Sequence, residues 1–172
     1  MATDRVQPEP RDPQCVFCRI VAGEIPAHRV HEDDHVLAFL DVAPLSRGHV
    51  LIIPRVHYAR LDEMPEALAG ACAALAVRVA RVLGVVLDGG RGGGGGEALA
   101  YNVLQNNGRR AHQAVDHVHF HIIPKPADSD DAPASGDGLT PGRGLVLSWP
   151  AGELDHADAA TLAEAIRGRL EG

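Results

Sequence analysis

Three histidines alternate with hydrophobic residues along one short segment. His117, His119 and His121 are separated by Val118 and Phe120. Alternate side chains of a β-strand point to the same face of a sheet, about 7 Å apart, so the imidazoles would form a row on one face. Imidazole can bind a metal ion, or act near neutral pH as a nucleophile and a proton donor. We therefore expect a functional site here rather than a solvent-facing strand that happens to contain histidine.

Two cysteines form a second candidate site, Cys15-x-x-Cys18. A redox function would need the helix start of a thioredoxin-like motif, which the surrounding sequence lacks, so metal binding is the better interpretation. Two thiolates need two further ligands to complete a tetrahedral site. The alternative is a pair of small core residues that bind no metal.

The elements that must position these residues are short strands. Strands are expected at residues 35–40, 48–53, 98–104 and 115–123, where β-branched and other hydrophobic residues lie between turn-forming ones. The first two strands should pair antiparallel. The sequence Asn106-Asn107-Gly108 favours a tight turn between the last two.

Two helices complete the expected architecture. Hydrophobic residues recur at spacings of three and four across residues 65–87, which predicts an amphipathic helix that covers one face of the sheet. A last helix should begin at Asp155, an N-cap, with Leu162, Ile166 and Leu170 along one side. Together these elements predict an α+β fold with a largely antiparallel sheet.

Composition limits the class of protein. The chain has 172 residues, enough for one domain, with 16 Lys and Arg against 23 Asp and Glu and a formal charge of −7. Such an acidic chain is not expected to bind nucleic acid backbones. Residues 68–87 are apolar but interrupted by Arg78 and Arg81, so no membrane span is expected. Three cysteines and a start without secretion-signal character indicate the cytoplasm, and also the nucleus if the source is eukaryotic.

The chain divides into three parts. Residues 1–14 are expected to be a disordered N-terminal tail. Residues 15–126 should form the domain, with a flexible Gly-rich loop at residues 88–96 to which we assign no chemistry. Residues 127–172 should be a C-terminal extension with a mobile linker, a segment around Trp149 and the terminal helix.

Two segments carry a resemblance to a known family. His-Val-His-Phe-His-Ile-Ile, from His117, resembles the signature of the histidine triad (HIT) nucleotide-binding superfamily. Cys-Val-Phe-Cys-Arg-Ile-Val-Ala-Gly-Glu-Ile-Pro, from Cys15, resembles that family's N-terminal segment. The resemblance runs from about Cys15 to Pro124 and is greatest to the purine nucleoside phosphoramidase branch. It implies a HIT-like fold, in which a mainly antiparallel sheet of about five strands carries one long helix, followed here by a C-terminal helix.

The resemblance also implies a nucleotide hydrolase that cleaves purine nucleoside 5′-phosphoramidates to AMP and an amine. His119, the middle histidine of the triad, would attack the α-phosphate and carry the nucleotidyl group. Neutral imidazole is a nucleophile and, once phosphorylated, a good leaving group, so one difficult displacement becomes two easier ones. The remaining implied roles are proton transfer beside the phosphate for His121 and His49, and binding of its oxygens for Asn106 and the backbone N–H groups near Gln113 and Ala114.

Other residues would bind the nucleoside. Asp41 corresponds to the family's ribose-binding acid, whose carboxylate oxygens can accept from two neighbouring hydroxyls. The alternative for Asp41 is a turn-capping carboxylate. Five hydrophobic residues match positions of the base cleft, although each is also suited to an ordinary core: Phe17, Ile20, Ile25, Phe39 and Leu51.

By the same resemblance, His57 and His117 would join Cys15 and Cys18 around a structural zinc ion with no open coordination position. No organic cofactor is expected, and the binding partner would be a purine nucleotide. A homodimer is also implied, because the family's core pairs through the long helix and the strand beside it.

The sequence leaves three alternatives open. His112 stands where many relatives have Gly, and Ala114 where several have a hydroxyl that reaches the leaving group, so a dinucleoside polyphosphate hydrolase of the same family is one alternative. A metal-dependent hydrolase that uses the triad histidines as ligands is another, but it leaves His49 and Asn106 unexplained. A non-catalytic nucleotide-binding adaptor would bind AMP without forming a covalent intermediate.

Overall fold

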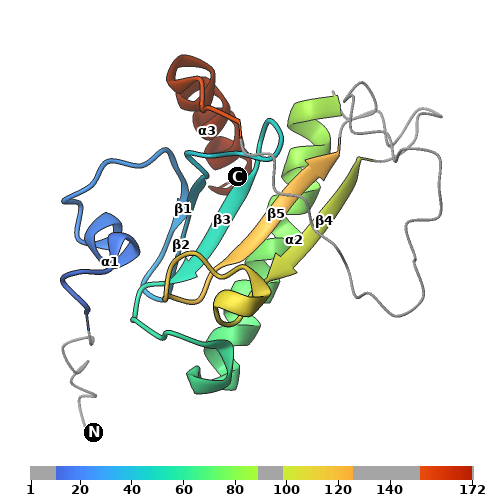
Figure 1. Cartoon of the computed structure of the whole chain (residues 1–172). Coiled ribbons are helices and arrows are strands. Elements are labelled where there is room, and N and C mark those ends of the chain that lie inside the picture. Colours follow the sequence, from blue (N-terminus) through green and yellow to red (C-terminus); the bar gives the residue numbers. More distant parts are fainter. Residues whose placement is uncertain (1–10, 89–98, 126–151, 172) are drawn as a thin grey trace, which may run out of the picture.

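The computed structural model describes residues 11–88, 99–125 and 152–171 (Figure 1). Most of the expected N-terminal tail, the Gly-rich loop from residue 89 onward, the C-terminal linker and Trp149 lie outside the described residues. The described part confirms an α+β fold.

One five-stranded sheet forms the centre of the molecule, with the strand order β1-β2-β3-β5-β4 and every neighbouring pair antiparallel (Figure 1). This confirms the expected sheet. Its strands are β1 (Arg29–Glu32), β2 (Val36–Leu40), β3 (Val50–Pro54), β4 (Ala100–Gln105) and β5 (Phe120–Lys125).

Three helices cover the two faces of this sheet. They are α1 (Val16–Val21), α2 (Glu66–Asp88) and α3 (His156–Glu171). The larger core cluster joins α2 and α3 to one face of the sheet, and a smaller cluster joins α1 to the opposite face. Both expected helices are therefore present, and α1 and β1 are elements that the sequence analysis did not identify.

The strand period decides which side chains face α1. Leu37, Phe39, Leu51 and Ile53 belong to the α1 cluster, whereas the residues between them belong to the cluster under α2 and α3. His121 lies opposite Leu51 in the β3–β5 register, so it faces the same side.

The start of the last strand differs from the prediction. We expected residues 115–123, but β5 begins at Phe120, so His117 and His119 precede the strand. The backbone N–H of Val118 donates to the carbonyl of Tyr58 at 2.7 Å. This bond draws the segment to the chain that follows β3 instead of into the sheet ladder. The expected alternation nevertheless persists, because Val118 and Phe120 pack with the cluster under α2 and α3, while the rings of His117 and His119 contact Phe17 of α1.

The connection between β4 and β5 is also longer than the expected tight turn. It contains a 3-10 helix at Arg109–Ala111. Gly108, directly before this helix, has a φ of 80°, in agreement with the turn-forming sequence in which it lies.

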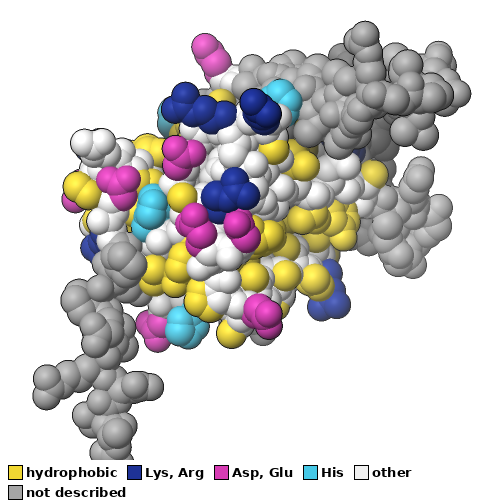
Figure 2. All heavy atoms as spheres, turned by 60° about the horizontal axis from the view of Figure 1, so that its bottom comes forward, with side chains coloured by type: hydrophobic (Ala, Val, Ile, Leu, Met, Phe, Trp, Pro, Cys, Tyr) yellow, Lys and Arg dark blue, Asp and Glu magenta, His cyan; other side chains and the backbone are white. Residues whose placement is uncertain are grey.

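The surface combines hydrophobic and charged side chains of both signs, as the face in Figure 2 shows. By length and composition alone, Glu66–Leu87 of α2 could cross a membrane. In the fold, Cys72, Leu75, Val79 and Leu83 of this helix are buried in the core under the sheet, while Val77 and Val85 are exposed.

Candidate active site and metal site

A cavity of about 600 Å³ opens between α1, the sheet and the loop that precedes β5. Two of the three expected catalytic histidines and eight of the nine expected nucleotide-binding residues line it: His119, His121, Asp41, Gln113, Ala114, Phe17, Ile20, Ile25, Phe39 and Leu51. His49 and Asn106 are not among the lining residues, and both are buried. The structure therefore brings ten of these expected residues together around one cavity with hydrophobic and imidazole side chains in its lining.

His119 is held in one tautomer. Its Nδ1 lies 2.6 Å from the carbonyl oxygen of His117. A carbonyl can only accept, so Nδ1 carries the proton and Nε2 has the free lone pair. Burial lowers the pKa of His119 below its ordinary value, although the His117 carbonyl and the Asp41 carboxylate act in the opposite direction. His119 is therefore a neutral imidazole with an unprotonated nitrogen, as a nucleophile requires.

A chain of hydrogen bonds fixes the tautomers of the other two histidines. The backbone N–H of Leu45 donates to His49 Nδ1 at 3.1 Å, so the proton of His49 is on Nε2. That N–H donates to His121 Nδ1 at 2.9 Å, which leaves the proton of His121 on Nε2. Burial lowers the pKa of His49 to about 4 and that of His121 to about 3. Both rings are neutral at pH 7, and His121 can donate a hydrogen bond from Nε2.

Asp41 both caps a turn and lines the cavity. One carboxylate oxygen accepts from the backbone N–H of Ala43 at 2.9 Å, which is a turn-capping contact. The other lies 3.6 Å from His49 Nδ1. Because Asp41 also lines the cavity, its carboxylate is placed where vicinal hydroxyls could bind.

Asn106 has an unpaired donor. Among the buried side-chain nitrogen and oxygen atoms of the described residues, its Nδ2 alone lacks a hydrogen-bond partner. An unpaired buried donor costs about 1–3 kcal/mol, so Asn106 Nδ2 requires an acceptor such as a bound water or a ligand.

The side chain and the backbone N–H of Gln113 are both used in hydrogen bonds within the protein. Its Nε2 donates to the carbonyls of Ala59 and Val115 at 2.7 and 3.0 Å, and its Oε1 accepts from the N–H of Gly108. Its own backbone N–H donates to the Gly108 carbonyl at 3.2 Å. Gln113 lines the cavity, but it shapes the loop instead of offering the backbone donor that we expected, which leaves that role to Ala114.

The sequence analysis treated His112 only as a departure from the family pattern, yet His112 also lines the cavity. Its φ of 64° makes it the one non-glycine residue with positive φ in the described parts of the chain. The Asn-Asn-Gly sequence before it signals an irregular loop, but nothing in the sequence shows that His112 points to the cavity.

The four expected metal ligands converge on one point. Cys15 Sγ and His117 Nδ1 are 3.4 Å apart, Cys18 Sγ and His57 Nδ1 are 3.4 Å apart, and Cys18 Sγ lies 3.7 Å from His117 Nδ1. In a tetrahedral zinc site, a cysteine sulfur and a histidine nitrogen bound to the same ion lie about 3.6 Å apart. The separations and the Cys₂His₂ donor set therefore fit a small tetrahedral metal ion.

Comparison with known proteins decides the family, since residues 22–128 match the HIT domain family. The chain belongs to the HIT family. Adenosine 5′-monophosphoramidase HNT1 of Saccharomyces cerevisiae is 38% identical over 165 residues, which cover 96% of this chain and 88% of that protein.

Solved structures of the HIT family agree with this assignment. A histidine triad nucleotide-binding protein from Candida albicans has a TM-score of 0.60 and 39% identity, and the match covers 92% of this chain and 98% of that one. A Zn-bound histidine triad family protein from Mycobacterium smegmatis has a TM-score of 0.64 and 31% identity, with 92% and 94% of the two chains covered.

In this HIT protein the ring of His117 is oriented for metal binding. Its Nε2 donates to the carbonyl of Pro54 at 2.9 Å, so the lone pair is on Nδ1, toward the two cysteines. Burial raises the pKa of the Cys18 thiol to about 11 in the absence of a cation. A bound metal cation would reverse this preference, because it stabilises the thiolate.

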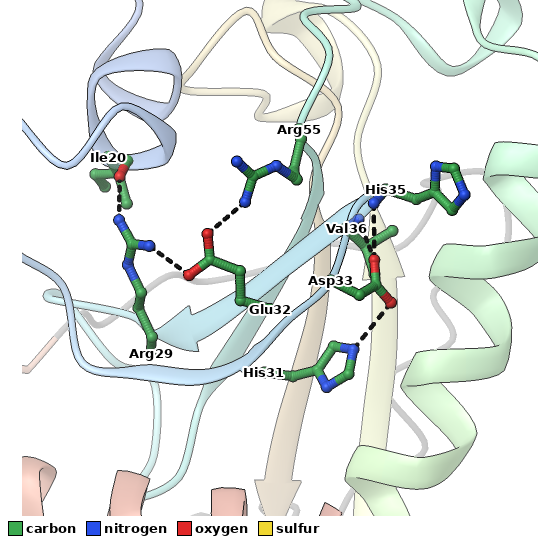
Figure 3. A network of polar contacts seen from close by, with 8 residues as sticks. All are labelled: Ile20, Arg29, His31, Glu32, Asp33, His35, Val36 and Arg55. Atoms are coloured by element: carbon green, nitrogen blue, oxygen red, sulfur yellow. Dashed lines mark hydrogen bonds and ion pairs between the residues drawn. The ribbon is translucent and has the colours of Figure 1, made fainter. Parts of the chain in front are cut away.

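Figure 3 shows how the HIT domain fastens α1, which carries Cys18, to the sheet. Arg29 of β1 donates to the carbonyl of Ile20 at 2.6 Å and also bonds Glu32. Glu32 in turn accepts from Arg55, two residues before the candidate metal ligand His57. One ionic network therefore joins two of the three chain segments that supply the candidate ligands, those of Cys18 and His57.

A second group of possible ligands lies in the HIT active site. Asp41, His49 and His121 have ligand atoms within 4.8 Å of one another. The Leu45 N–H occupies His49 Nδ1, however, and His121 Nδ1 accepts from His49. These bonds use the lone pairs that a metal would need, so the geometry favours proton relay over coordination.

Proposed function

We propose that this HIT protein hydrolyses purine nucleoside 5′-phosphoramidates through a nucleotidyl group carried on His119. The observation that carries this proposal is the fixed tautomer of His119, whose Nδ1–H donates to the His117 carbonyl and leaves Nε2 free in a nucleotide-sized cavity. The name of the yeast relative, adenosine 5′-monophosphoramidase, supports the same substrate class.

The two chemical steps follow from the positions of the donors. In the first, the Nε2 lone pair of His119 forms a bond to phosphorus, the bond from phosphorus to the amine breaks, and the amine leaves with a proton taken from solvent. In the second, water attacks phosphorus and gives up a proton to solvent, the bond to His119 breaks, and AMP is released. Nε2–H of His121, Nδ2 of Asn106 and the backbone N–H of Ala114 would stabilise charge on the phosphate oxygens, which is the main source of catalysis in such transfers.

We infer that the metal held by Cys15, Cys18, His57 and His117 is a structural zinc ion. The Cys₂His₂ donor set and the separations of its atoms support zinc, and the related Mycobacterium smegmatis protein is zinc-bound. None of the three cysteines forms a disulfide, which supports a location in the reducing cytoplasm.

We also propose a homodimer that pairs through β4 and α2. β4 is an edge strand, and its Tyr101 and Val103 are about half exposed, at 47% and 53%. Exposed Val77 and Val85 lie on α2. An unpaired, partly hydrophobic edge strand is a favourable site for pairing with a second copy.

Turnover of matched substrates tests the proposed reaction. Purified protein would be incubated with adenosine 5′-phosphoramidate or with diadenosine polyphosphates, and AMP release measured with and without ethylenediaminetetraacetate in the assay. We expect faster release from the phosphoramidate, no immediate loss with the chelator, and no release by His119→Ala. Faster release from the polyphosphates would favour the other HIT hydrolase class, and binding of AMP without any turnover would favour an adaptor.

A further inference from the structure

Helix α3 lies beyond the HIT family match, which ends at residue 128. It is nevertheless part of the main core, because Ala159, Leu162, Ala163 and Ile166 are buried against α2 and the sheet. The N-terminal end of α3 also contacts the loop of residues 41–49, which contains Asp41 and His49 (Figure 1).

Two polar contacts join α3 and the chain before it to this loop. Arg47 Nε and Nη2 donate to the two carboxylate oxygens of Asp158 at 2.7 and 2.6 Å, a bidentate pair. The backbone N–H of Gly152 donates to the carbonyl of Pro44 at 2.9 Å. The guanidinium of Arg47 lowers the pKa of Asp158, so the pair is formed at neutral pH.

A cavity of about 380 Å³ lies between the loop and α3. Leu45 and His49 line it from the loop, and Leu154 and Leu162 line it from the C-terminal segment. The loop is therefore not supported there by close packing, which elsewhere fixes protein interiors. Its separation from α3 depends instead on the polar contacts at the rim of this cavity.

The other side of the loop is fixed independently. Ser46 Oγ donates to the carbonyl of Pro124 at 2.6 Å. Gly48 has a φ of 85°, and a Cβ there would lie 3.0 Å from Leu87 and 3.3 Å from Leu83 of α2, closer than ordinary contact. Leu45, whose N–H fixes the tautomer of His49, therefore lies between an anchor on β5 and α2 and an anchor on α3.

We propose that Arg47 and Asp158 are positioning residues for the HIT active site, which hold the Leu45 N–H against His49 Nδ1. This inference rests on the proposed function for its effect on catalysis. If the loop shifts, the 3.1 Å bond from Leu45 lengthens, and the proton of His49 can occupy Nδ1 instead of Nε2. His49 then no longer donates to His121, and His121 loses the tautomer that presents Nε2–H to the phosphate.

Kinetics of single and paired variants test this proposal. Asp158→Ala and Arg47→Ala should each lower kcat for adenosine 5′-phosphoramidate by about three- to tenfold, an effect typical of a small misplacement, with KM changed less than twofold. The exchanged pair, Arg47→Asp with Asp158→Arg, should recover at least half of the parent kcat. Asp62→Ala is the matched control, because Asp62 accepts from Arg60 at 3.0 Å in an exposed pair outside the cavity walls.

Imidazole ¹⁵N spectra of the unliganded protein supply a second readout that does not need turnover. The parent protein should show His49 protonated on Nε2, and Asp158→Ala should show a mixture of the two tautomers, whereas Asp62→Ala should match the parent. Unchanged kcat in Asp158→Ala, or an unchanged His49 tautomer, would overturn the positioning role even if the melting temperature fell. If the parent protein cleaved no nucleotide, the proposed function would fail, but the tautomer comparison would still decide the role of this pair.

Discussion

The carbonyl oxygen of His117 lies 2.6 Å from Nδ1 of His119, so a residue of the candidate metal site directly orients the proposed nucleophile. The ring of the same residue offers Nδ1 to the cysteines and bonds the Pro54 carbonyl through Nε2. The aromatic ring of Phe17 contacts both imidazoles, with centroids 5.8 and 5.3 Å away. The metal site and the reaction site are therefore two sides of one short segment.

Loss of the metal site should impair catalysis at a distance. Cys18→Ser should lower the melting temperature and slow kcat by up to about a hundredfold, because a displaced His117 carbonyl misplaces the nucleophile. Affinity for AMP should be nearly unchanged, since Cys18 does not line the nucleotide cavity. Elemental analysis, thermal unfolding and steady-state kinetics would measure the three effects.

Cys72→Ala is the control, because Cys72 lies on α2, is buried in the core and is not one of the candidate metal ligands. It should lower stability but keep about one zinc ion per chain. If Cys18→Ser kept the kcat and the melting temperature of the parent protein, the metal site would have no influence on the reaction.

Acid should destabilise the fold through His49 and His121, two of the four buried histidines. In the native state the pKa of His49 is about 4 and that of His121 about 3, against about 6.5 in an unfolded chain. Below pH 6.5 the unfolded state binds more protons, so the free energy of unfolding falls by about 1.4 kcal/mol per pH unit for each histidine until the native pKa is reached. Urea unfolding at pH 7 and pH 5 would show this fall, and it should be smaller in His49→Gln. An equal fall in the free energy of unfolding of the parent protein and of His49→Gln would contradict the lowered pKa assigned to His49.

Asn106 should matter for ligand binding more than for folding. Its Nδ2 has no partner within the described residues, so Asn106→Asp removes no internal hydrogen bond of that atom and places a negative charge near the phosphate site. We expect the Kd for AMP to rise about tenfold to a hundredfold, which is typical for loss of a hydrogen bond to a charged group. Asn107→Ala is the contrasting variant, because Asn107 Oδ1 accepts from the Leu61 N–H at 2.8 Å. It should lower the melting temperature and leave the Kd near the parent value, and the reverse pattern would contradict this division of roles.

The proposed dimer should depend on the exposed edge strand. Val103→Arg places a charge on β4 at a half-exposed position, so light scattering at micromolar concentration should show a dimer for the parent protein and a monomer for the variant. Thr161→Arg, on the exposed side of α3, should stay dimeric. A monomeric mass for the parent protein would contradict the proposed dimer.

The sequence was sufficient where local chemistry and period act together. The family resemblance assigned Phe39 and Leu51 to the base cleft, and both line the cavity, on the face of β2 and β3 that the strand period turns toward α1. The His-rich segment supplies residues of both the cavity and the candidate metal site. The prediction from sequence failed where a residue distant in the chain determines the backbone conformation. The bond from Val118 to Tyr58 ends the strand early, and the bonds of Gln113 within its loop remove a donor that a linear sequence leaves free. The Arg47–Asp158 pair joins residues 111 positions apart, which no local pattern can show.

The most direct test of the central claim is to trap the covalent intermediate. The protein would be mixed with adenosine 5′-phosphoramidate, quenched within milliseconds at a pH at which phosphorus–imidazole bonds survive, and mapped by peptide mass spectrometry. The account predicts an adenylyl group on His119 of the parent protein and no such group on His119→Ala. An adenylyl group on another residue, or rapid turnover with no modified peptide at any time, would contradict nucleophilic catalysis by His119.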